Sequence, residues 1–231
     1  LCSEGNHSRG RLCHTTKQSS YFFADLKLSN YPLPMPAPPD DPDAALMLRF
    51  RAGDESAFDL LIEKFKAPVF NYVCRQINNE NEAEDIAQNV FIQVYKSAER
   101  YEPSAKFTTW LFTIAHNLCL NEFRRRKRHP LQSLDEAASE DPESAPIQFS
   151  DPAARSPAVE SSEKELQQHI LAAIQKLPEN QRTAVLLCRY EDLPYEEIAR
   201  VLGTTVSATK SLLHRARQTL KYELRGFLRE T

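Results

Sequence analysis

The chain has 231 residues, a formal net charge of −3, and only five glycines beside fifteen prolines. So few glycines argue against a sheet protein with many tight turns, whereas long stretches of helical periodicity favour a mostly helical fold of one or two domains. Because no apolar run reaches the ~20 residues of a membrane-spanning helix and no signal segment is recognisable, we expect a cytoplasmic protein without membrane insertion.

The charges are segregated along the chain. Residues 106–129 contain six Lys and Arg against one Glu, and residues 200–229 contain seven against one. The intervening residues 131–165 contain nine Asp and Glu against two basic residues. Two basic segments around an acidic one suit a polyanionic partner such as nucleic acid, which the net charge alone would not suggest.

The five cysteines are widely scattered, without the paired spacing of a disulfide framework or a zinc site, which fits a reducing cytosol. A metal site could in principle be built from Cys2, His7, Cys13 and His14, but their spacing matches no standard site. We therefore predict neither a metal nor another cofactor.

Residues 1–43 are polar and then proline-dense, with six prolines between Pro32 and Pro42, and we expect them to form a disordered extension. Met35 lies just ahead of the first periodic segment. Our hypothesis is that residues 1–34 come from an over-extended gene start or a non-methionine start codon, and the alternative is a genuine flexible tail.

Helical patterns begin near residue 43, with a first helix that ends at Gly53 and a second that begins near Ser56. A third helix is predicted from Glu82 to about Lys96. One side of it is apolar and buried, and the other is a polar face with one exposed isoleucine. Such an isoleucine is usually without function, but it is also what a partner-binding helix looks like. The members of this polar face are Asp85, Gln88, Asn89, Ile92 and Lys96.

The segment from Phe107 to Arg128 has two different faces at helical spacing. The buried stripe is predicted to contain Leu111, Ala115, Leu118 and Glu122. The other stripe contains Trp110, Thr113, Asn117, Asn121, Arg124 and Arg128. An indole that stacks on bases, amides that bond base edges and guanidinium groups that hold phosphates form a nucleic-acid face. The alternative is a solvated basic helix end that complements the helix dipole.

We expect Phe107 to act as a hydrophobic staple before this helix, with Thr108 or Thr109 as the N-cap. After the helix, residues 131–163 are rich in proline, serine and acidic residues and too poor in apolar side chains to bury a core, so we predict a flexible linker. Two further helices, up to Leu177 and after Pro178, are predicted beyond the linker.

The clearest local pattern is LPYEEIARVLGTTVSATKSLLHRARQTLK, which predicts a helix, a glycine turn at Gly203 and a second helix capped by Thr205. The buried side of the second helix contains Thr209, Leu213, Ala216 and Leu220. Its outer side contains Ser207, Lys210, Ser211, His214 and Arg215. A basic outer face is typical of a recognition helix in the major groove of DNA. A helical hairpin without that role explains the apolar stripe but explains the basic face less well.

Three segments carry a close resemblance to a known family. They are AEDIAQNVFIQVYK, FTTWLFTIAHNLCLNEFRRRKR and LPENQRTAVLLCRYEDLPYEEIARVLGTTVSATKSLLHRARQTL. They resemble the extracytoplasmic-function (ECF) group of sigma factors of bacterial RNA polymerase, in particular sigma-E-like members. The resemblance covers residues 44–130 and 164–229. It implies an all-α fold in which a region 2 helical bundle at 44–130 and a region 4 helix-turn-helix at 164–231 are joined by the acidic linker.

The resemblance also implies a non-enzymatic function, which is to bind core RNA polymerase and direct promoter-specific initiation. The first segment resembles the helix that binds the clamp of the polymerase large subunit, and region 4 is expected to contact the flap. The second segment resembles the helix that reads and melts the minus-ten element, and the third resembles the domain that reads the minus-thirty-five element. An anti-sigma factor is a further expected partner.

By this resemblance, Tyr101 and residues 102–106 lie where the family captures a flipped minus-ten base, and Asn117 lies where it contacts the non-template strand. The expected minus-ten contacts are Tyr101, Lys106, Trp110, Asn117, Asn121, Arg124, Arg125 and Arg128. The expected minus-thirty-five contacts are Thr205, Ser207, Ala208, Lys210, Ser211, His214 and Arg215. The expected contacts with the polymerase clamp are the five residues of the polar face on the third helix.

Three positions depart from the family pattern. Pro194 stands where a capping serine is usual, Thr209 replaces a valine, and Leu212 replaces an arginine. These departures leave the minus-thirty-five sequence open.

Two other functions compete with this interpretation. The first is a helix-turn-helix regulator that binds duplex operator DNA without polymerase. The second is an enzyme with Glu80, Glu82, Glu84 and Asp85 as metal ligands, but these residues straddle a helix start, where acidic side chains are expected for the dipole.

Overall fold

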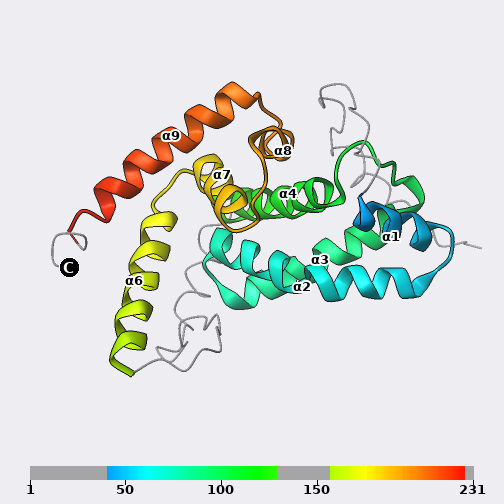
Figure 1. Cartoon of the computed structure of the whole chain (residues 1–231), viewed down its shortest axis with the longest axis horizontal. Helices are drawn as coiled ribbons and strands as arrows, with labels where there is room; N and C mark the ends of the chain where they lie inside the picture. The colour runs from blue at the N-terminus through cyan, green and yellow to red at the C-terminus, as the bar shows by residue number, and fades with distance from the viewer. Residues whose placement is uncertain (1–40, 129–156, 227–231) are drawn as a thin grey trace, which may run out of the picture. The chain divides into compact units, whose positions relative to one another are not determined.

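The structure, a computed structural model, describes residues 41–128 and 157–226, and within these ranges every regular element is a helix (Figure 1). This confirms the all-α fold. The predicted disorder of residues 1–40, most of the predicted linker and the four Cys and His residues near the N-terminus lie outside the described residues.

The N-terminal helices are α1 (Pro42–Arg51), α2 (Glu55–Ile77), α3 (Glu80–Ser97), the short 3-10 helix η2 (Ala98–Arg100) and α4 (Phe107–Arg128). The long helix α2 packs against α1, α3 and α4. It does so because Leu61, Phe65, Val69 and Tyr72 recur at helical spacing and are all buried. A positive φ at Gly53 ends α1, as the sequence predicts.

One carboxylate caps two helices of this set. Asp41 Oδ1 accepts hydrogen bonds from the backbone N–H groups of Asp43 (3.0 Å) and Ala44 (3.3 Å), while Asp41 Oδ2 accepts one from Phe107 N–H (2.7 Å). The helix α1 begins at Pro42, inside the segment 1–43 that the sequence predicts to be disordered and just ahead of residue 43, near which the helical pattern begins. The expected N-cap at Thr108 or Thr109 is wrong, because α4 begins earlier and its first N–H is satisfied by a residue distant in sequence.

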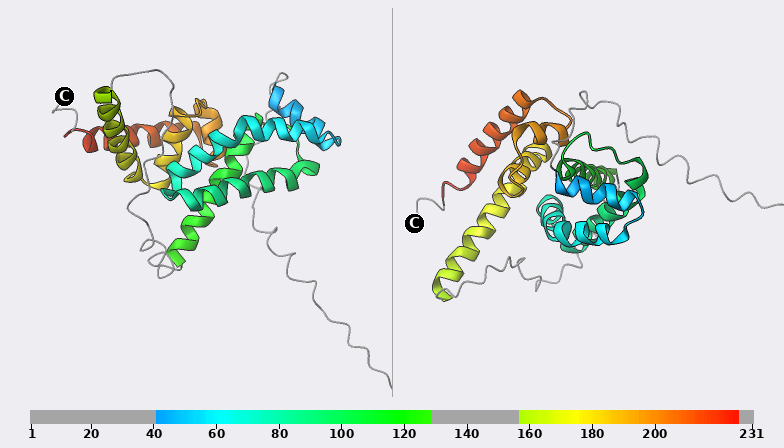
Figure 2. Two further views of the ribbon diagram at one scale, coloured as in Figure 1. Left: turned by 90° about the horizontal axis from the view of Figure 1, so that it is seen from below. Right: turned by 45° about the vertical axis from the view of Figure 1, so that its right-hand side comes forward.

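The C-terminal helices are α6 (Pro157–Gln175), α7 (Glu179–Arg189), α8 (Tyr195–Val201) and α9 (Val206–Glu223). The helix α7 packs against both α8 and α9. Both views of Figure 2 show α6 and α9 extending from α7 and α8 to the side away from α3. The helix α6 begins inside the segment 131–163 that the sequence predicts as linker.

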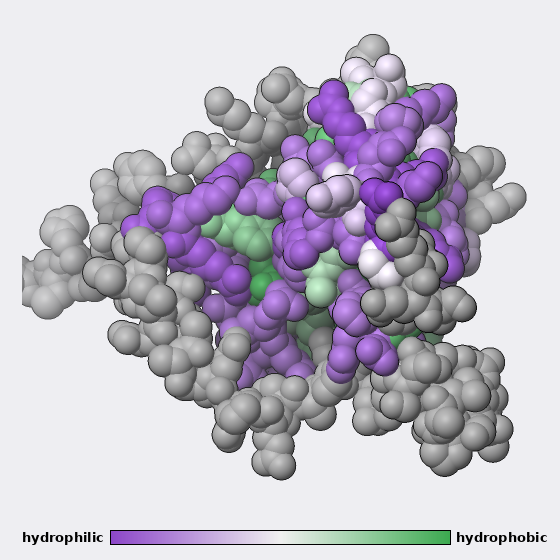
Figure 3. Space-filling model, turned by 90° about the vertical axis from the view of Figure 1, so that its left-hand side faces the viewer, coloured by the Kyte–Doolittle hydropathy of each residue, from purple (hydrophilic) through white to green (hydrophobic). Residues whose placement is uncertain are grey.

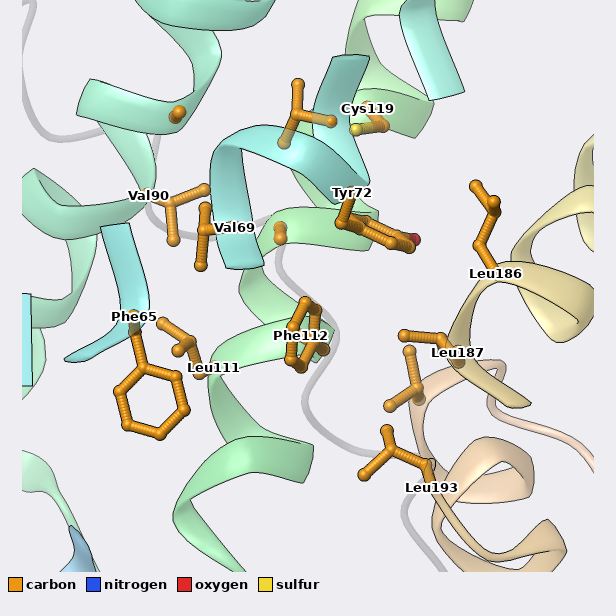
Figure 4. Close-up of a cluster of buried hydrophobic side chains, with 14 of the residues drawn as sticks. Phe65, Val69, Tyr72, Val90, Leu111, Phe112, Cys119, Leu186, Leu187 and Leu193 are labelled. Carbon is orange, nitrogen blue, oxygen red and sulfur yellow. The ribbon is translucent and has the colours of Figure 1, made fainter. Parts of the chain in front are cut away.

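A single cluster of buried side chains joins the N-terminal and C-terminal helices (Figure 4). Phe112 of α4 packs edge-on against Tyr72 of α2, with ring centroids 5.3 Å apart, and points toward Leu187 and Leu193 of the C-terminal helices. A buried hydrogen bond from Gln76 Nε2 to Thr183 Oγ1 (2.8 Å) crosses the same boundary. The two helical domains predicted from the sequence thus share one core in this structure.

Candidate nucleic-acid interface

The turn before α9 has the geometry that the sequence predicts. Gly203 adopts a φ of +60°, and the N–H of Thr204 donates to the carbonyl of Ala199 (2.9 Å). Thr205 Oγ1 then accepts from the N–H of Ala208 at 3.1 Å, which confirms the predicted N-cap. The turn and the cap together fix the direction in which α9 leaves α8.

The helix α9 presents a polar and basic face to solvent. Its inner side is anchored by Thr209, Leu213 and Ala216, which are buried. The outer residues that are exposed are Thr205, Ser207, Lys210, Ser211, His214 and Arg215, and Ala208 is half-buried among them. The hydroxyl of Ser211 donates to the carbonyl of Ser207 (3.1 Å), so part of its hydrogen-bonding capacity is used within the helix.

The basic end of α4 separates into two kinds of arginine. Arg124 and Arg128 are exposed, and their hydrogen bonds are local, from Arg124 to Asn121 Oδ1 (3.2 Å) and from Arg128 to the carbonyl of Arg124 (3.3 Å). Arg125 instead forms an ion pair with Glu122 (2.8 Å). Arg124 and Arg128 therefore have more of their charge available to an external anion than Arg125 has.

The start of α4 is more enclosed than its sequence suggests. Trp110 is half-buried against Tyr101 and Phe107, with ring centroids 4.9 and 5.8 Å away. Thr113 is buried, and its hydroxyl donates to the carbonyl of Thr109 (2.7 Å), so its assignment to the nucleic-acid face is wrong. Asn117 is half-buried, and Asn121 is exposed. The helix has neighbours on more than one side, which a two-faced helical pattern does not anticipate.

Tyr101, one of the expected minus-ten contacts, is buried in this structure. Only 3% of it is exposed, its ring lies beside Phe107 and Trp110, and burial raises the pKa of its hydroxyl. Arg51 donates to the carbonyl of Tyr101 (2.8 Å), which fixes the backbone. A flipped base cannot stack on this ring unless the aromatic cluster opens, so capture of a base by Tyr101 stays a prediction that requires a rearrangement.

Lys106 is half exposed but is already paired. Its Nζ lies 3.0 Å from Glu197 Oε1, and Thr109 Oγ1 donates to the other carboxylate oxygen at 2.9 Å. Glu197 belongs to the first turn of α8, where the sequence offers only the ordinary explanation that an acid suits a helix N-terminus. Nothing in the local pattern could have identified its partners, because they lie in a different domain of the predicted architecture.

All five residues of the polar face on α3 are exposed. Ile92 is 45% exposed, and next to the predicted face Tyr95 is 55% exposed. Tyr95 lies against Phe50 of α1 and Phe58 of α2, with ring centroids 5.2 and 5.5 Å away. Aromatic side chains of α1, α2 and α3 therefore meet on the side of α3 that exposes Tyr95. Tyr95 is not among the residues predicted to contact polymerase. Its place on the exposed side of the α3 pattern is the signal that could have identified it.

Two further observations concern a metal site and a membrane-spanning helix. Within the described ranges, no group of three or more His, Cys, Asp and Glu side chains is arranged to hold a metal ion. Of the carboxylates considered as ligands, Glu82 is paired with Arg126. None of the helices in the described part of the chain combines the length and the apolar character that a membrane crossing requires.

Comparison with known proteins identifies the family. The family model described as Sigma-70 region 2 matches residues 61–129, and the one described as Sigma-70, region 4 matches residues 167–220. The RNA polymerase sigma-H factor of Pseudomonas aeruginosa is 34% identical over 188 residues, which are 81% of this chain and 96% of that protein. The ECF RNA polymerase sigma factor SigW of Bacillus subtilis is 32% identical over 175 residues, which are 76% of this chain and 92% of that protein.

A solved structure agrees in fold. The sigma factor RpoE of Bartonella quintana, co-crystallised with the anti-sigma factor NepR, has a TM-score of 0.53 at 21% sequence identity, and the match covers 73% of this chain and 96% of that chain. Since both sigma regions are matched in order along the chain and the relatives are matched over nearly their whole length, this chain belongs to the ECF sigma factors of bacterial RNA polymerase and is sigma-E-like.

Proposed function

We propose that this sigma factor recognises its promoter with two surfaces, the outer face of α9 on duplex DNA and the basic side of α4 on separated strands. As a sigma factor, the chain directs promoter-specific initiation by RNA polymerase. The observation that supports this division most directly is the arrangement of α9. Its N-cap hydrogen bond is formed and its apolar side is buried, whereas its basic face is exposed to solvent.

The helix α9 reads the minus-thirty-five element from the major groove. Its first turns, with Ser207 and Lys210, lie closest to base edges, and Arg215 lies far enough along the helix to meet a backbone phosphate. Such an arrangement takes sequence specificity from the N-terminal residues and general affinity from the basic residues that follow.

The helix α4 holds the minus-ten region. Asn121, Arg124 and Arg128 are exposed on one side of its C-terminal half, where an amide can bond a base edge and guanidinium groups can hold phosphates. Lys106 and Asn117 add a cation and an amide nearer the start of the helix. The half-buried ring of Trp110 is available for stacking only after the aromatic cluster around it moves.

The exposed face of α3 is the contact with the polymerase clamp. Ile92 and Tyr95 are large apolar side chains exposed to solvent, which mark a surface that binds a protein rather than DNA.

The C-terminal helices are the part of the chain that we propose to contact the polymerase flap. On the face formed by α6 and α9, Figure 3 shows apolar surface in a hollow between hydrophilic ridges.

An anti-sigma factor is the further partner that we propose, because the related structure from Bartonella quintana contains one. The same exposed apolar surfaces that suit polymerase would suit such a protein, which would then exclude polymerase by occupying them. Polymerase acts in the cytoplasm, and we place the action of this protein there.

The test is transcription in vitro with purified core enzyme and a library of promoter sequences. The chain should yield transcripts that start at a subset of promoters sharing two elements, and core enzyme without the chain should yield none of them. A regulator of the ordinary helix-turn-helix kind would instead bind duplex DNA by itself and would leave the specificity of core enzyme unchanged.

A further inference from the structure

Glu197 of α8 is a buried carboxylate that is bound by two side chains at the start of α4. Its side chain is 8% exposed, and its two oxygens contact Lys106 Nζ (3.0 Å) and Thr109 Oγ1 (2.9 Å). Burying a carboxylate costs free energy unless it is paired and hydrogen-bonded, so the contact persists only while both partners are available. Glu197 comes from α8, the first helix of the helix-turn-helix, and both partners lie at the start of α4.

A second carboxylate of the C-terminal helices is paired at the opposite end of α4. Lys127 Nζ lies 2.9 Å from Glu179 Oε1, at the N-terminus of α7. Each end of the proposed minus-ten helix therefore has a lysine paired with a glutamate of the C-terminal set. A carboxylate and a phosphate are both oxygen anions that compete for one ammonium group.

Other contacts fix the same arrangement. Gln76 Nε2 donates to Thr183 Oγ1, Arg182 donates to the carbonyl of Gln76 (2.7 Å), and Phe112 of α4 faces Leu187. The α8 helix is thereby held against α4 at the position where Lys106 would meet DNA. We call this arrangement, defined by the pairs Lys106–Glu197 and Lys127–Glu179, the closed contact.

We propose that the closed contact is an autoinhibitory state, in which Glu197 occupies Lys106, the cation that the proposed function gives to promoter DNA, and Glu179 occupies Lys127, which lies among the arginines at the basic end of α4. The inference rests on the proposed function of α4 and adds the regulation of that surface. If a phosphate took Lys106, Glu197 would remain buried without its counter-ion and next to a second negative charge. Binding of promoter DNA and formation of the closed contact therefore exclude each other. The closed contact lowers the affinity for promoter DNA, and bound DNA lowers the stability of the closed contact by the same factor.

The test compares amide hydrogen exchange in the full chain and in two variants, Glu197→Gln and Glu197→Lys. Glu196→Gln is the matched control, because Glu196 is the exposed neighbour in the same helical turn and its replacement changes the net charge equally. Exchange should accelerate by about threefold or more in Glu197→Gln, and further in Glu197→Lys, at residues 107–113 of α4 and 195–201 of α8 together. Residues 90–94 of α3 and the Glu196→Gln control should match the wild type.

A fluorescein-labelled single-stranded oligonucleotide provides the second readout. Glu197→Gln should bind it about threefold or more tightly than Glu196→Gln does, since only the former releases Lys106. The double variant Glu179→Gln with Glu197→Gln covers the case in which Glu197→Lys does not fold, because the Glu179 pair is largely exposed. Its exchange and its affinity should change in the same direction by more than those of the single variant.

The proposal is overturned if α4 exchanges at the wild-type rate in both the single and the double glutamine variants, or if only α8 changes. It is also overturned if Glu196→Gln and Glu197→Gln bind the oligonucleotide equally. Failure of the proposed function would be seen separately, as an absence of promoter-specific transcripts with core enzyme. That readout does not enter the exchange measurement.

Discussion

Lys210 and Arg215 lie on the same exposed face of α9 but at different distances from its N-terminus. A side chain in the first turns reaches base edges, and one further along reaches the DNA backbone. Lys210→Ala should therefore relax discrimination at one or two base pairs by ~1–3 kcal/mol. Arg215→Ala should weaken binding to every sequence and lower the slope of log K against log salt by about one.

The measurement is a salt titration of polymerase-free binding to specific and random duplexes, followed by fluorescence anisotropy. Lys221→Ala is a suitable control, because this exposed lysine lies on the same helix near its C-terminal end. Equal effects of Lys210→Ala and Arg215→Ala on specific and random DNA would contradict the division of roles.

His116 makes the stability of the shared core depend on pH. It is buried beside Thr183, and burial lowers its pKa from 6.5 to about 4. The charge of Glu179 opposes this shift, and the charge of Arg124 adds to it, both by less than burial does. Above pH 6.5 the ring is neutral in both states. Between pH 6.5 and 4 the unfolded chain binds a proton that the folded chain excludes, so stability falls as pH falls, by up to about 3 kcal/mol.

The comparison variant is His116→Gln, which keeps a polar side chain but does not titrate. Denaturant unfolding of both proteins should give free energies that converge or cross as pH falls through this window. Glu191, whose pKa burial raises to about 7, contributes a slope of the opposite sign, but both proteins contain it and it cancels in the difference. Parallel curves would show that His116 does not carry this dependence.

Single residues are also where the sequence was least informative. The exposed positions of α9 follow from one amphipathic helix with one neighbouring surface, so helical spacing alone identifies them. Thr113 was misplaced because α4 is covered on more than one side, and the sequence did not anticipate that Tyr101 would be buried beside Phe107 and Trp110. Glu197 was missed because one of its partners, Thr109, lies 88 positions away along the chain and the other, Lys106, lies farther still, at distances that no local pattern encodes.

At the scale of helices, α3 carries a surface that its own packing does not need. Its buried side is small and apolar, whereas Asp85 and Ile92 are exposed. Replacing both by arginine should abolish binding to core polymerase, because it removes an apolar contact and reverses a charge while the buried side is untouched. Helix content by circular dichroism and binding of the full chain to duplex DNA should stay at the wild-type level.

A matched control is the pair Asp59→Arg and Leu60→Arg on α2, which also combines an exposed acid with an exposed apolar residue. The control should retain affinity for core enzyme in a pull-down with purified subunits. If the α3 double variant binds core enzyme as well as the wild type does, α3 is not the clamp contact.

Most helices could be predicted, because their apolar periodicity, glycine ends and caps agree with one another. Gly53, Gly203 and Thr205 act in the structure as the sequence suggests. Helix starts were predicted less well. The start of α4 depends on Asp41, which caps it from the far end of the N-terminal set, and the composition around Pro157 resembles a linker although α6 begins there.

At the scale of the whole molecule, the composition and the family resemblance predict two helical domains, but not the core that they share. The boundary is formed by Phe112, Leu187 and the Gln76–Thr183 hydrogen bond, each of which looks like an ordinary core residue of its own domain. Periodicity tells which side of a helix is buried and does not tell what buries it. The two surfaces proposed for promoter DNA are consequently linked by a contact that must open before both can act.

The central claim is that the chain acts with core polymerase to open promoters, and permanganate reactivity of thymines measures this opening directly. On a promoter selected by transcription, reactive thymines should appear in the minus-ten region only when core enzyme and the chain are both present. Asn117→Ala should bind core enzyme normally and reduce this reactivity, because its amide contacts a base only after strand separation. Unchanged reactivity in core enzyme with and without the chain, together with binding of the chain alone to the duplex, would contradict the account.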